Sequence, residues 1–557
     1  MCQYSVIVLN FGHSVLNSLD DYTRAAAEIY RHYRQGQNVV AVTSAQSDQT
    51  DILLAEARNI GPEGQAKNLP ELLQLGERRS AALLALALER IGAPAFVRQA
   101  RDLGLTGRGS YMDAELTGLN TDQLLADLKA HDIVVMPGFV AIGEKDRPVL
   151  LGQGGADLTA LYVADKLGVE AVLLKDVDGV YDRDPRQSGT APLRYEHISY
   201  NDAAVKAAPL IAPKALAFAK ANNMTFRLGR PGLPRFTKIG DKTGPLSPAP
   251  KVKKLRVAML GCGIVGGGVF RQIEANPQHF DLVKIMVRNV DKYIDQGYAP
   301  SLLTTSAKDL FDAKPDIFID VSGPIDPALK MTEDMLKAGV HVVSANKQAI
   351  AAGGQDLIDL ATKHNVKLLF SSAAGGGMPV LEMCLREAGR ITRVEALLNG
   401  TTNYMLGEMD KGKSYAEALK EAQDKGFAEA DPTADVGGAD AAAKIRLIAL
   451  LAFGEQLTLN DIPRETIENF APNEPPKGIM KRVATVWRDK NGFSATLELR
   501  DLSPNNFIAQ ADGEEAHAIF EFSDGDEYRI RGKGAGRWPT TASVMADMFD
   551  ISAVYLN

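Results

Sequence analysis

The segment Leu255-Arg-Val-Ala-Met-Leu-Gly-Cys-Gly-Ile-Val-Gly266 decides how the second half of this chain folds. It opens with a short apolar run, Leu255–Leu260, that is typical of a strand. A Gly-x-Gly-x-x-Gly loop follows and leads into a segment that can be helical, Ile264–Ile273. A strand, a glycine-rich turn and a helix N-terminus in this order predict a binding site for the pyrophosphate of a dinucleotide.

Strands and helices alternate after this segment, which predicts a parallel, doubly wound sheet. Strands are expected at Asp281–Val287, Ile317–Ser322, Val340–Ser344 and Val366–Phe370, and helices at Pro327–Ala338 and Gln355–Lys363. Ligands bind outside the carboxyl ends of such strands. The residues expected to contact the cofactor are therefore Gly261, Gly263, Ile264, Val265, Gly266, Ser322, Gly323, Ser344, Asn346 and Lys347.

The tip of the second strand discriminates between the two nicotinamide dinucleotides. An acid there accepts the ribose hydroxyls of NAD, whereas arginine accommodates the 2′-phosphate of NADP. This chain has Val287-Arg288-Asn289 and no acid at the tip. NADP is therefore favoured, and the alternative is that Arg288 is an ordinary surface charge.

A second group of residues points to a substrate. Asp440 and Lys444 lie four residues apart at the start of an apolar helix predicted at Ala441–Phe453, so they share one helix face. Two more carboxylates, Glu429 and Asp435, lie just upstream. Three acids and a lysine beside a buried helix predict a pocket for a small molecule with a free amino group. The alternative is an exposed helix ion pair worth about 0.2–0.5 kcal/mol.

Together, these features resemble homoserine dehydrogenases over residues 255–557. The matching stretches are Gly261–Gly266, Ser344–Lys347, Gly375–Pro379, Leu398–Tyr404, Gly426–Pro432 through Lys444, and Gly532–Pro539 with Ala542-Ser543. The resemblance implies NAD(P)H-dependent reduction of L-aspartate 4-semialdehyde to L-homoserine, a step toward threonine, methionine and isoleucine.

The resemblance also implies roles for single residues. Lys444 matches the proton donor to the carbonyl oxygen, and Asp440 matches the acid that holds it. Glu429 and Asp435 match residues that contact the ammonium or hydroxyl of the substrate, and Lys347 lies near the nicotinamide. Which lysine moves the proton stays open; we favour Lys444 because Asp440 can orient it. Further matching positions are Gly400 and Thr401 for the substrate and Gly536 for the cofactor.

One departure concerns a monovalent cation. The family has a glutamate among backbone carbonyls around the ion, and this chain has Ser371 at that position. A weak sodium site is the most that is expected, at Ser371, Ala374, Gly376 and Met378.

Residues 1–240 resemble the amino-acid kinase fold, and aspartokinase in particular. The matching pieces are Phe11-Gly12, Gly76-Glu77, Met136–Phe139, Gly154–Asp157, Asp176–Tyr181 and Asp184–Arg186. The residues expected for catalysis are missing. Asn10 stands where aspartokinases have the lysine that neutralises the transferring phosphoryl group, and His13 replaces a glycine. Gln153 replaces an arginine, Lys175 a threonine and Ala212 a histidine, so we expect an inactive kinase.

The expected fold is α/β throughout. It comprises an amino-acid-kinase-like α/β/α domain (1–240), a linker without ACT regulatory domains (241–253), a Rossmann domain (254–390), an α+β catalytic and dimerisation domain (391–530) and a C-terminal segment that returns to the nucleotide domain (531–557). Because no ACT domain fits, threonine inhibition through such a module is expected to be absent. Family habit suggests a homo-oligomer built around Ile391–Leu398 and Phe520–Glu527.

Composition agrees with a protein of several globular domains. The apolar fraction of 45% is that of a soluble globular protein, and the net charge of −8 argues against nucleic acid or an anionic membrane as partner. Three cysteines and no long apolar segment predict a cytoplasmic location. Two alternatives stay open: a bifunctional aspartokinase/homoserine dehydrogenase with an active kinase half, and a non-catalytic sensor that binds ligands in both halves.

Overall fold

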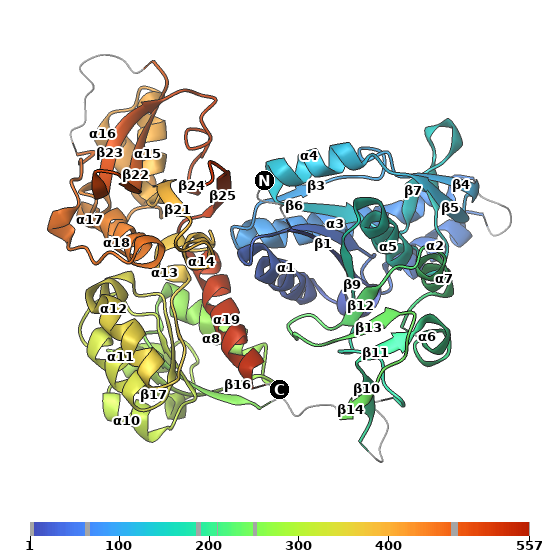
Figure 1. Ribbon diagram of the computed structural model, residues 1–557, viewed down its shortest axis with the longest axis horizontal. Coiled ribbons are helices and arrows are strands. Elements are labelled where there is room, and N and C mark those ends of the chain that lie inside the picture. Colours follow the sequence, from blue (N-terminus) through green and yellow to red (C-terminus); the bar gives the residue numbers. More distant parts are fainter. Residues whose placement is uncertain are drawn as a thin grey trace. The chain divides into compact units, whose positions relative to one another are not determined.

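A computed structural model describes residues 5–61, 67–184, 191–208, 210–248, 253–468 and 477–555. The chain divides into two compact units near residue 252, and each is described by itself (Figure 1). No helix in the described ranges combines the length and apolarity needed to cross a membrane.

The first unit is built on an eight-stranded sheet with the strand order β11-β13-β12-β9-β1-β2-β6-β3. All neighbours are parallel except β12 and β13. The strands are β1 (Ser5–Phe11), β2 (Gln37–Thr43), β3 (Ala95–Val97), β6 (Ile133–Pro137), β9 (Glu170–Leu174), β11 (His197–Ser199), β12 (Phe226–Gly229) and β13 (Phe236–Gly240). Its central strands are continuous apolar runs, as expected where both faces are buried.

Helices and two small sheets complete this unit. The helices are α1 (Leu19–Arg34), α2 (Gln49–Ile60), α3 (Leu69–Arg90), α4 (Thr121–His131), α5 (Gly155–Leu167), α6 (Tyr200–Lys206) and α7 (Pro213–Ala221). The small sheets are β5-β4-β7-β8, with β4 (Thr106–Ser110), β5 (Asp113–Gly118), β7 (Val140–Ile142) and β8 (Pro148–Leu150), and β10-β14, with β10 (Leu193–Tyr195) and β14 (Leu246–Pro248). The interval expected to be a linker thus contains β14, which pairs with β10 in the first unit.

The second unit contains a six-stranded parallel sheet with the order β17-β16-β15-β18-β19-β20. Numbered within the sheet this is 3-2-1-4-5-6, the order of dinucleotide-binding folds, so the predicted doubly wound sheet is confirmed. Its strands are β15 (Leu255–Leu260), β16 (Phe280–Met286), β17 (Leu303–Thr304), β18 (Ile317–Asp320), β19 (His341–Ser344) and β20 (Leu368–Leu369). Its helices are α8 (Ile264–Glu274), α9 (Val290–Ile294), α10 (Ala307–Asp312), α11 (Ala328–Lys337) and α12 (Lys347–Lys363).

Helix α12 differs from its predicted range. It begins at Lys347 instead of Gln355, because the Asn346 side chain caps it by accepting from the Ala349 backbone N–H at 3.1 Å. Gly354, at φ 50°, kinks the helix and separates the missed first turns from the predicted part. The early start places Lys347 in the first turn, at the carboxyl end of β19.

The remainder of the second unit is an antiparallel sheet, β23-β22-β21-β24-β25, with helices. Its strands are β21 (Ile391–Ala396), β22 (Ile479–Asp489), β23 (Gly492–Leu502), β24 (Glu515–Phe522) and β25 (Glu527–Lys533). Its helices are α13 (Ser372–Gly375), α14 (Val380–Arg386), α15 (Gly400–Asp410), α16 (Tyr415–Asp424), α17 (Thr433–Val436) and α18 (Ala439–Phe453). The last helix, α19 (Arg537–Val554), packs against α8, and Val544 and Met548 lie in the core of the nucleotide-binding sheet.

Candidate active site

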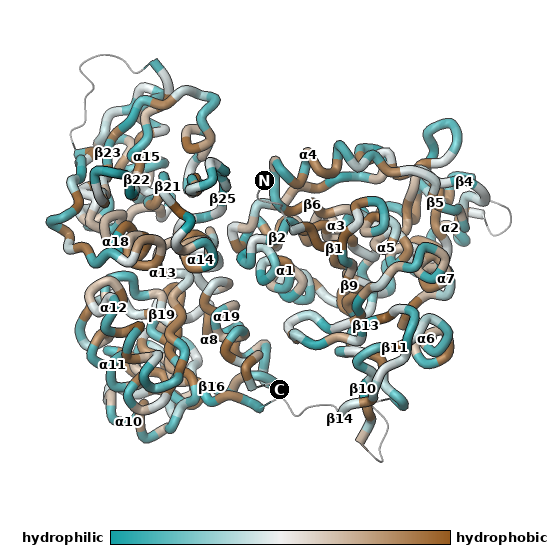
Figure 2. The backbone as a smooth tube through the Cα atoms, viewed as in Figure 1, coloured by the Kyte–Doolittle hydropathy of each residue, from teal (hydrophilic) through white to brown (hydrophobic). Residues whose placement is uncertain are grey.

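Helix α18 carries the centre of the site. It is hydrophobic and buried along most of its length (Figure 2). Gly438 precedes it in the left-handed conformation (φ 83°), and a Cβ there would lie 2.8 Å from Leu497 Cδ2, so glycine is required. Asp440 follows in the first turn and Lys444 one turn later, and both are buried. An ionic pair on a buried helix must therefore be satisfied inside the protein.

Asp440 binds two lysines from different parts of the second unit. Its Oδ2 lies 3.0 Å from Lys444 Nζ on the same helix, and its Oδ1 lies 2.8 Å from Lys347 Nζ at the start of α12. Lys444 Nζ also donates to the Leu398 carbonyl at 2.5 Å. The Lys444 side chain is 6% exposed and that of Lys347 is 32% exposed, so one ammonium is enclosed and the other is accessible.

Asp440 and the two lysines stabilise each other's charged forms. Burial by itself would raise the pKa of Asp440, but the ammonium groups of Lys444 and Lys347 outweigh it and hold that pKa well below its usual range. Burial lowers the pKa of Lys347, and the attraction of Asp440 more than offsets this, so the net shift is upward. Lys347 and Asp440 are therefore both charged near neutral pH.

Asn399, at the N-cap of α15, joins two carboxylates. Its Nδ2 donates to Asp435 Oδ1 at 2.6 Å and to Asp440 Oδ2 at 3.0 Å, while its Oδ1 accepts from the Thr402 backbone N–H. Burial, together with the nearby charge of Asp440, raises the pKa of Asp435 in spite of the bond from Asn399. Asn399 therefore holds two acids together that would otherwise repel each other.

Arg482 fixes the backbone of the segment that carries Asp435. It extends from β22, and its guanidinium donates to the backbone carbonyls of Asp435 (2.5 Å) and Val436 (2.7 Å). Burial lowers its pKa to about 10. Neither Arg482 nor Asn399 was expected from the sequence to have a role. Asn399 lies in a matched stretch, whereas nothing near Arg482 in the sequence connects it to residues 435–440.

The other predicted substrate residues differ in exposure. Glu429 is exposed and near enough to Lys347 to raise the pKa of that lysine. Thr401 is buried, and its hydroxyl donates to the Phe427 carbonyl at 2.6 Å, which fixes the loop before Glu429. Gly400 opens α15, where a Cβ would lie 3.3 Å from the Glu514 carbonyl oxygen. Thr401 and Gly400 thus shape the site through the backbone.

The glycine loop has the geometry that a dinucleotide needs. Gly261 has φ 91°, and a Cβ there would lie 3.0 Å from the Val321 carbonyl oxygen; a Cβ on Gly266 would lie 2.8 Å from the Gly261 oxygen. In front of the loop the space is open, because Cβ atoms on Gly263 and Gly323 would meet nothing within 4 Å. Ile264 at the N-terminus of α8 is 76% exposed. The residues present therefore fit a pyrophosphate at this helix N-terminus.

Hydrogen bonds fix the strand ends beside this loop. Buried Asp320, at the end of β18, accepts from the Ser322 hydroxyl at 2.7 Å and the Ser322 N–H at 3.0 Å. Burial raises its pKa to about 6. The Ser344 hydroxyl accepts from the Asn346 N–H, and Asn346 Nδ2 donates to the Pro324 carbonyl at 2.8 Å. This network sets the start of α12, and with it the position of Lys347.

The remaining expected cofactor residues lie around the same sheet. Val265 follows Ile264 in the first turn of α8 and packs against the core of the sheet. Arg288 is exposed and is the second residue after β16. Gly536, at φ 112°, is the N-cap of α19.

Ser371 has a partner that its sequence neighbourhood does not indicate. Its hydroxyl donates to Asp547 Oδ1 at 2.7 Å and its N–H to Oδ2 at 3.1 Å. Asp547 is fully buried in α19. A carboxylate thus lies beside the position where the family has its glutamate. Within the described ranges, no group of three or more His, Cys, Asp or Glu side chains is placed to hold a metal ion.

Comparisons with known proteins agree with this geometry. Residues 261–371 match the model of the homoserine dehydrogenase NAD-binding domain, and residues 379–549 match the homoserine dehydrogenase model. The homoserine dehydrogenase of Bacillus subtilis (strain 168) is 33% identical over 316 residues, which cover 53% of this chain and 72% of that protein. The chain belongs to the homoserine dehydrogenase family. The resemblance inferred from the sequence is thereby confirmed.

Two further relatives support the assignment. The homoserine dehydrogenase of Mycobacterium tuberculosis (strain H37Rv) is 34% identical over 319 residues, covering 53% of this chain and 72% of that protein. The crystal structure of a homoserine dehydrogenase from Thiobacillus denitrificans matches with 30% identity and a TM-score of 0.51, covering 55% of this chain and 74% of that one. Residues 5–229 match the amino acid kinase family, so the expected fusion of the two folds is also confirmed.

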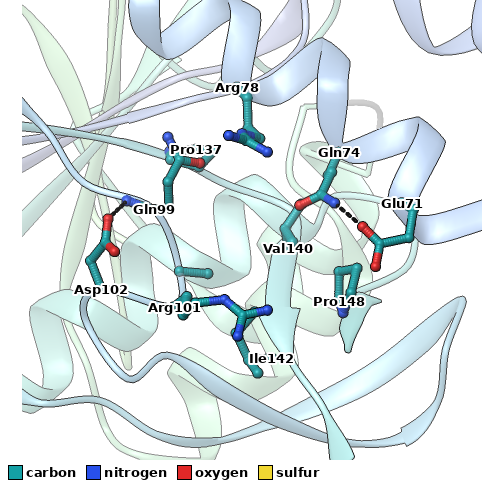
Figure 3. A pocket seen from close by; sticks show the side chains of 11 residues that line it. Glu71, Gln74, Arg78, Gln99, Arg101, Asp102, Pro137, Val140, Ile142 and Pro148 are labelled. Carbon is teal, nitrogen blue, oxygen red and sulfur yellow. Dashed lines mark hydrogen bonds between the residues drawn. The ribbon is translucent and has the colours of Figure 1, made fainter. Parts of the chain in front are cut away.

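The kinase-like unit contains a cavity of about 180 Å³ (Figure 3). It is lined by Glu71, Gln74, Arg78, Gln99, Ala100, Arg101, Asp102, Pro137, Val140, Ile142 and Pro148. Several rim groups bind one another: Gln74 Nε2 donates to Glu71 Oε2 at 2.6 Å, and the Gln99 N–H donates to Asp102 Oδ2 at 2.8 Å. None of the residues that depart from the aspartokinase pattern lines this cavity.

Proposed function

We propose that Lys444 and Lys347, both paired with Asp440, carry the homoserine dehydrogenase reaction of this chain. The supporting observation is that one carboxylate binds two ammonium groups, one enclosed by α18 and one at the edge of the nucleotide-binding sheet. The substrate in this proposal is L-aspartate 4-semialdehyde and the product L-homoserine.

A proton must reach the carbonyl oxygen during the reduction. When bound, the reduced nicotinamide supplies the hydride that forms the new C–H bond at the aldehyde carbon. The oxygen then carries negative charge, which Lys444 neutralises by giving it a proton. An ammonium has three N–H donors, and Lys444 directs two of them at Leu398 and Asp440. The third is left for the substrate, and such a positioned acid contributes about 10²–10⁴ in rate.

Asp440 and Lys347 prepare this transfer. Asp440 fixes the Lys444 ammonium one helical turn away and keeps it in an enclosed position. Lys347 binds the other oxygen of Asp440 and retains two donors for the substrate or the nicotinamide. The substrate carries an ammonium of its own, for which Glu429 and Asp435 are the proposed partners. Burial of Asp435 strengthens such a pair, because the local dielectric is low.

NADP is the proposed cofactor. Arg288 lies exposed at the tip of β16 and the acid typical of NAD enzymes is absent there. A 2′-phosphate offers Arg288 a bidentate, charged partner. A weak monovalent-cation site around Ser371, with backbone carbonyls at Ala374, Gly376 and Met378, and a homo-oligomer built on the catalytic domain also remain proposals.

We further propose that the kinase-like unit does not transfer phosphoryl groups. Gln153 cannot replace an arginine as bidentate partner for a carboxylate. His13 is exposed. Ala212 packs directly on the glycine loop, since a Cβ on Gly154 would lie 1.9 Å from the Ala212 Cβ. An active kinase half is the alternative, and it predicts ADP release that depends on both ATP and aspartate.

Two substitutions test the substrate assignment. The purified chain should oxidise NADPH with L-aspartate 4-semialdehyde and form L-homoserine. Glu429→Gln and Asp435→Asn should raise KM for the semialdehyde more than they lower kcat, because their partner, the ammonium, does not change during the reaction. If both variants lower kcat and leave KM unchanged, neither residue binds the substrate ammonium.

A further inference from the structure

A half-buried arginine of the second unit binds two backbone carbonyls. Arg446 lies on α18, two residues after Lys444. Its Nη2 donates to the Ala351 carbonyl of α12 at 2.6 Å, and its Nε donates to the Leu457 carbonyl, beyond the end of α18, also at 2.6 Å. Burial lowers its pKa, and the attraction of Asp461 offsets this in part. A charge that is desolvated in order to reach two carbonyls needs a reason for its position.

Helix α12 is interrupted next to the carbonyl that Arg446 binds. Gly354, with φ 50° and ψ −133°, divides it into a first part at 347–353 and a second part after the kink. In a continuous helix the Ala351 carbonyl would accept from the N–H four residues later, which here lies beyond the kink. Arg446 thus places a cation and a donor at the C-terminal end of the first part, where both are favourable.

The segment that follows α18 covers the same kink. A Cβ on Gly354 would lie 2.9 Å from the Gln456 Nε2 atom. Gln456 directly precedes Leu457, whose carbonyl accepts from Arg446. The guanidinium of Arg446 therefore connects the kink of α12 to the segment that packs on it.

The first part of α12 carries Lys347 and depends on contacts at both of its ends. It has about two turns, and helices this short are not stable by themselves in water. Asn346 caps its N-terminal end, and Arg446 binds its C-terminal end. In the described part of the chain, two polar contacts join α12 to α18: Lys347 with Asp440 at 2.8 Å, and Ala351 with Arg446. Because Ala351 lies one turn after Lys347, the second contact also fixes the position of that lysine.

We propose that Arg446 is a positioning residue, which holds the first part of α12 against α18 and thereby keeps the Lys347 ammonium at Asp440. The consequence for catalysis rests on the role proposed above for Lys347. Arg446 acts through this lysine, since its own hydrogen bonds go to backbone carbonyls. A displacement of about 1 Å at a reacting group can cost about 10² in rate, so even a small shift of α12 should be measurable.

The charged groups around Lys347 make its titration a readout of its position. Asp440 on α18, Asp435 on α17 and Glu429 in the preceding loop all favour its ammonium form, and burial opposes it. Lys444, at the other oxygen of Asp440, is the nearby like charge. If Lys347 moves away from Asp440, it loses the largest of the attractions and keeps most of the burial, so its pKa should fall.

The first test measures this titration in the full chain without cofactor or substrate. The Lys347 side chain is 32% exposed, so acetic anhydride can reach it, and the neutral amine is the form that reacts. The rate of Lys347 acetylation is followed by mass spectrometry as a function of pH. In Arg446→Met the titration of Lys347 should move to lower pH by about 1 unit or more.

Two further variants make this result specific. Arg488→Met is the matched control, because the partners of Arg488, the Phe453 carbonyl at 3.1 Å and the Glu455 carboxylate, both lie at the end of α18; Lys347 should titrate in it as in the wild type. Arg446→Lys keeps a cation but loses the fork of two fixed donors, so Lys347 should titrate at lower pH than in the wild type. This variant gives the answer if Arg446→Met does not fold. An unchanged Lys347 titration in the Arg446 variants overturns the proposal, as does an equal shift in Arg488→Met.

The second test is kinetic and uses NADPH-dependent reduction of L-aspartate 4-semialdehyde. Arg446→Met should lower kcat about 10- to 10²-fold in the wild type and have little further effect in Lys347→Met, because the two residues act as one unit. The same loss in both backgrounds contradicts the proposal. If Lys347→Met keeps the kcat of the wild type, the catalytic role of Lys347 is wrong, and the titration alone then decides whether Arg446 positions this side chain.

Discussion

Replacing Asp440 by asparagine tests the two-lysine arrangement. The substitution keeps the shape of the side chain and removes the charge that binds Lys347 at 2.8 Å and Lys444 at 3.0 Å. Two ammonium groups are then left close together without their common partner. Breaking a buried ion pair from one side costs about 3–5 kcal/mol, so Asp440→Asn should lower the free energy of unfolding by about that amount.

Activity should fall as well. Without Asp440 the Lys444 ammonium is no longer fixed, and we expect kcat for semialdehyde reduction to decrease about 10²–10³-fold. Asp440 also raises the pKa of Lys347. The pKa of Lys347 is therefore lower in the variant. The alkaline limb of its pH–activity profile should lie at a lower pH than that of the wild type.

The assay follows NADPH oxidation against pH, together with urea unfolding of the same samples. Asp334→Asn is the matched control, because Lys330 and Asp334 form an exposed pair at 2.6 Å, also four residues apart on a helix. That pair should contribute no more than about 1 kcal/mol. If Asp440→Asn keeps wild-type kcat and an unchanged alkaline limb, the reasoning about the lysines is refuted.

Three further predictions concern other residues. Arg288→Asp should lower kcat/KM with NADPH about tenfold or more and leave that with NADH unchanged or higher; an unchanged ratio of the two values would show that Arg288 does not read the 2′-phosphate. Asn399→Leu should raise KM for the semialdehyde, because Asp435 and Asp440 lose the amide between them, and wild-type kinetics would argue against this role. Burial raises the pKa of Glu77 from 4.5 to about 8, so the folded protein holds this proton more tightly than the unfolded chain. As pH rises from the lower to the higher of these pKa values, the wild type loses up to about 5 kcal/mol of its free energy of unfolding. The stability of Glu77→Gln relative to the wild type should therefore increase between about pH 5 and pH 8. A melting-temperature difference that is independent of pH would contradict the raised pKa of this buried acid.

The parts of the fold that sequence predicts well are those with local signals. The strand Leu255–Leu260 and the glycine loop after it are contiguous in sequence, and β15 has the predicted bounds. The start of α12 was missed, because glycines at 353 and 354 resemble a loop and the capping bond from Asn346 is a detail of geometry. Strand β14 was missed because its pairing with β10 is decided some 50 residues away in sequence.

In the site, too, local contacts could be predicted from the sequence and contacts between distant segments could not. Lys444 and Asp440 are four residues apart, and their pairing follows from helical spacing. The contribution of Arg482 depends on β22 bringing this side chain to the backbone carbonyls of Asp435 and Val436 at the end of α17, which no local pattern reveals. In the first unit, Asn10 and Lys175 both bind the Asp157 carboxylate, and this relation depends on the parallel register of β1 and β9. Each of the two was therefore interpreted from the sequence as a separate loss.

The most direct test of the central claim compares Lys444→Ala with Lys347→Ala in NADPH-dependent reduction of L-aspartate 4-semialdehyde. If Lys444 supplies the proton, its alanine variant should lose about 10²–10⁴-fold in kcat while KM changes little. An external primary amine should restore part of that rate. A Lys444→Ala enzyme with wild-type kcat would contradict the claim, as would amine rescue seen only with Lys347→Ala.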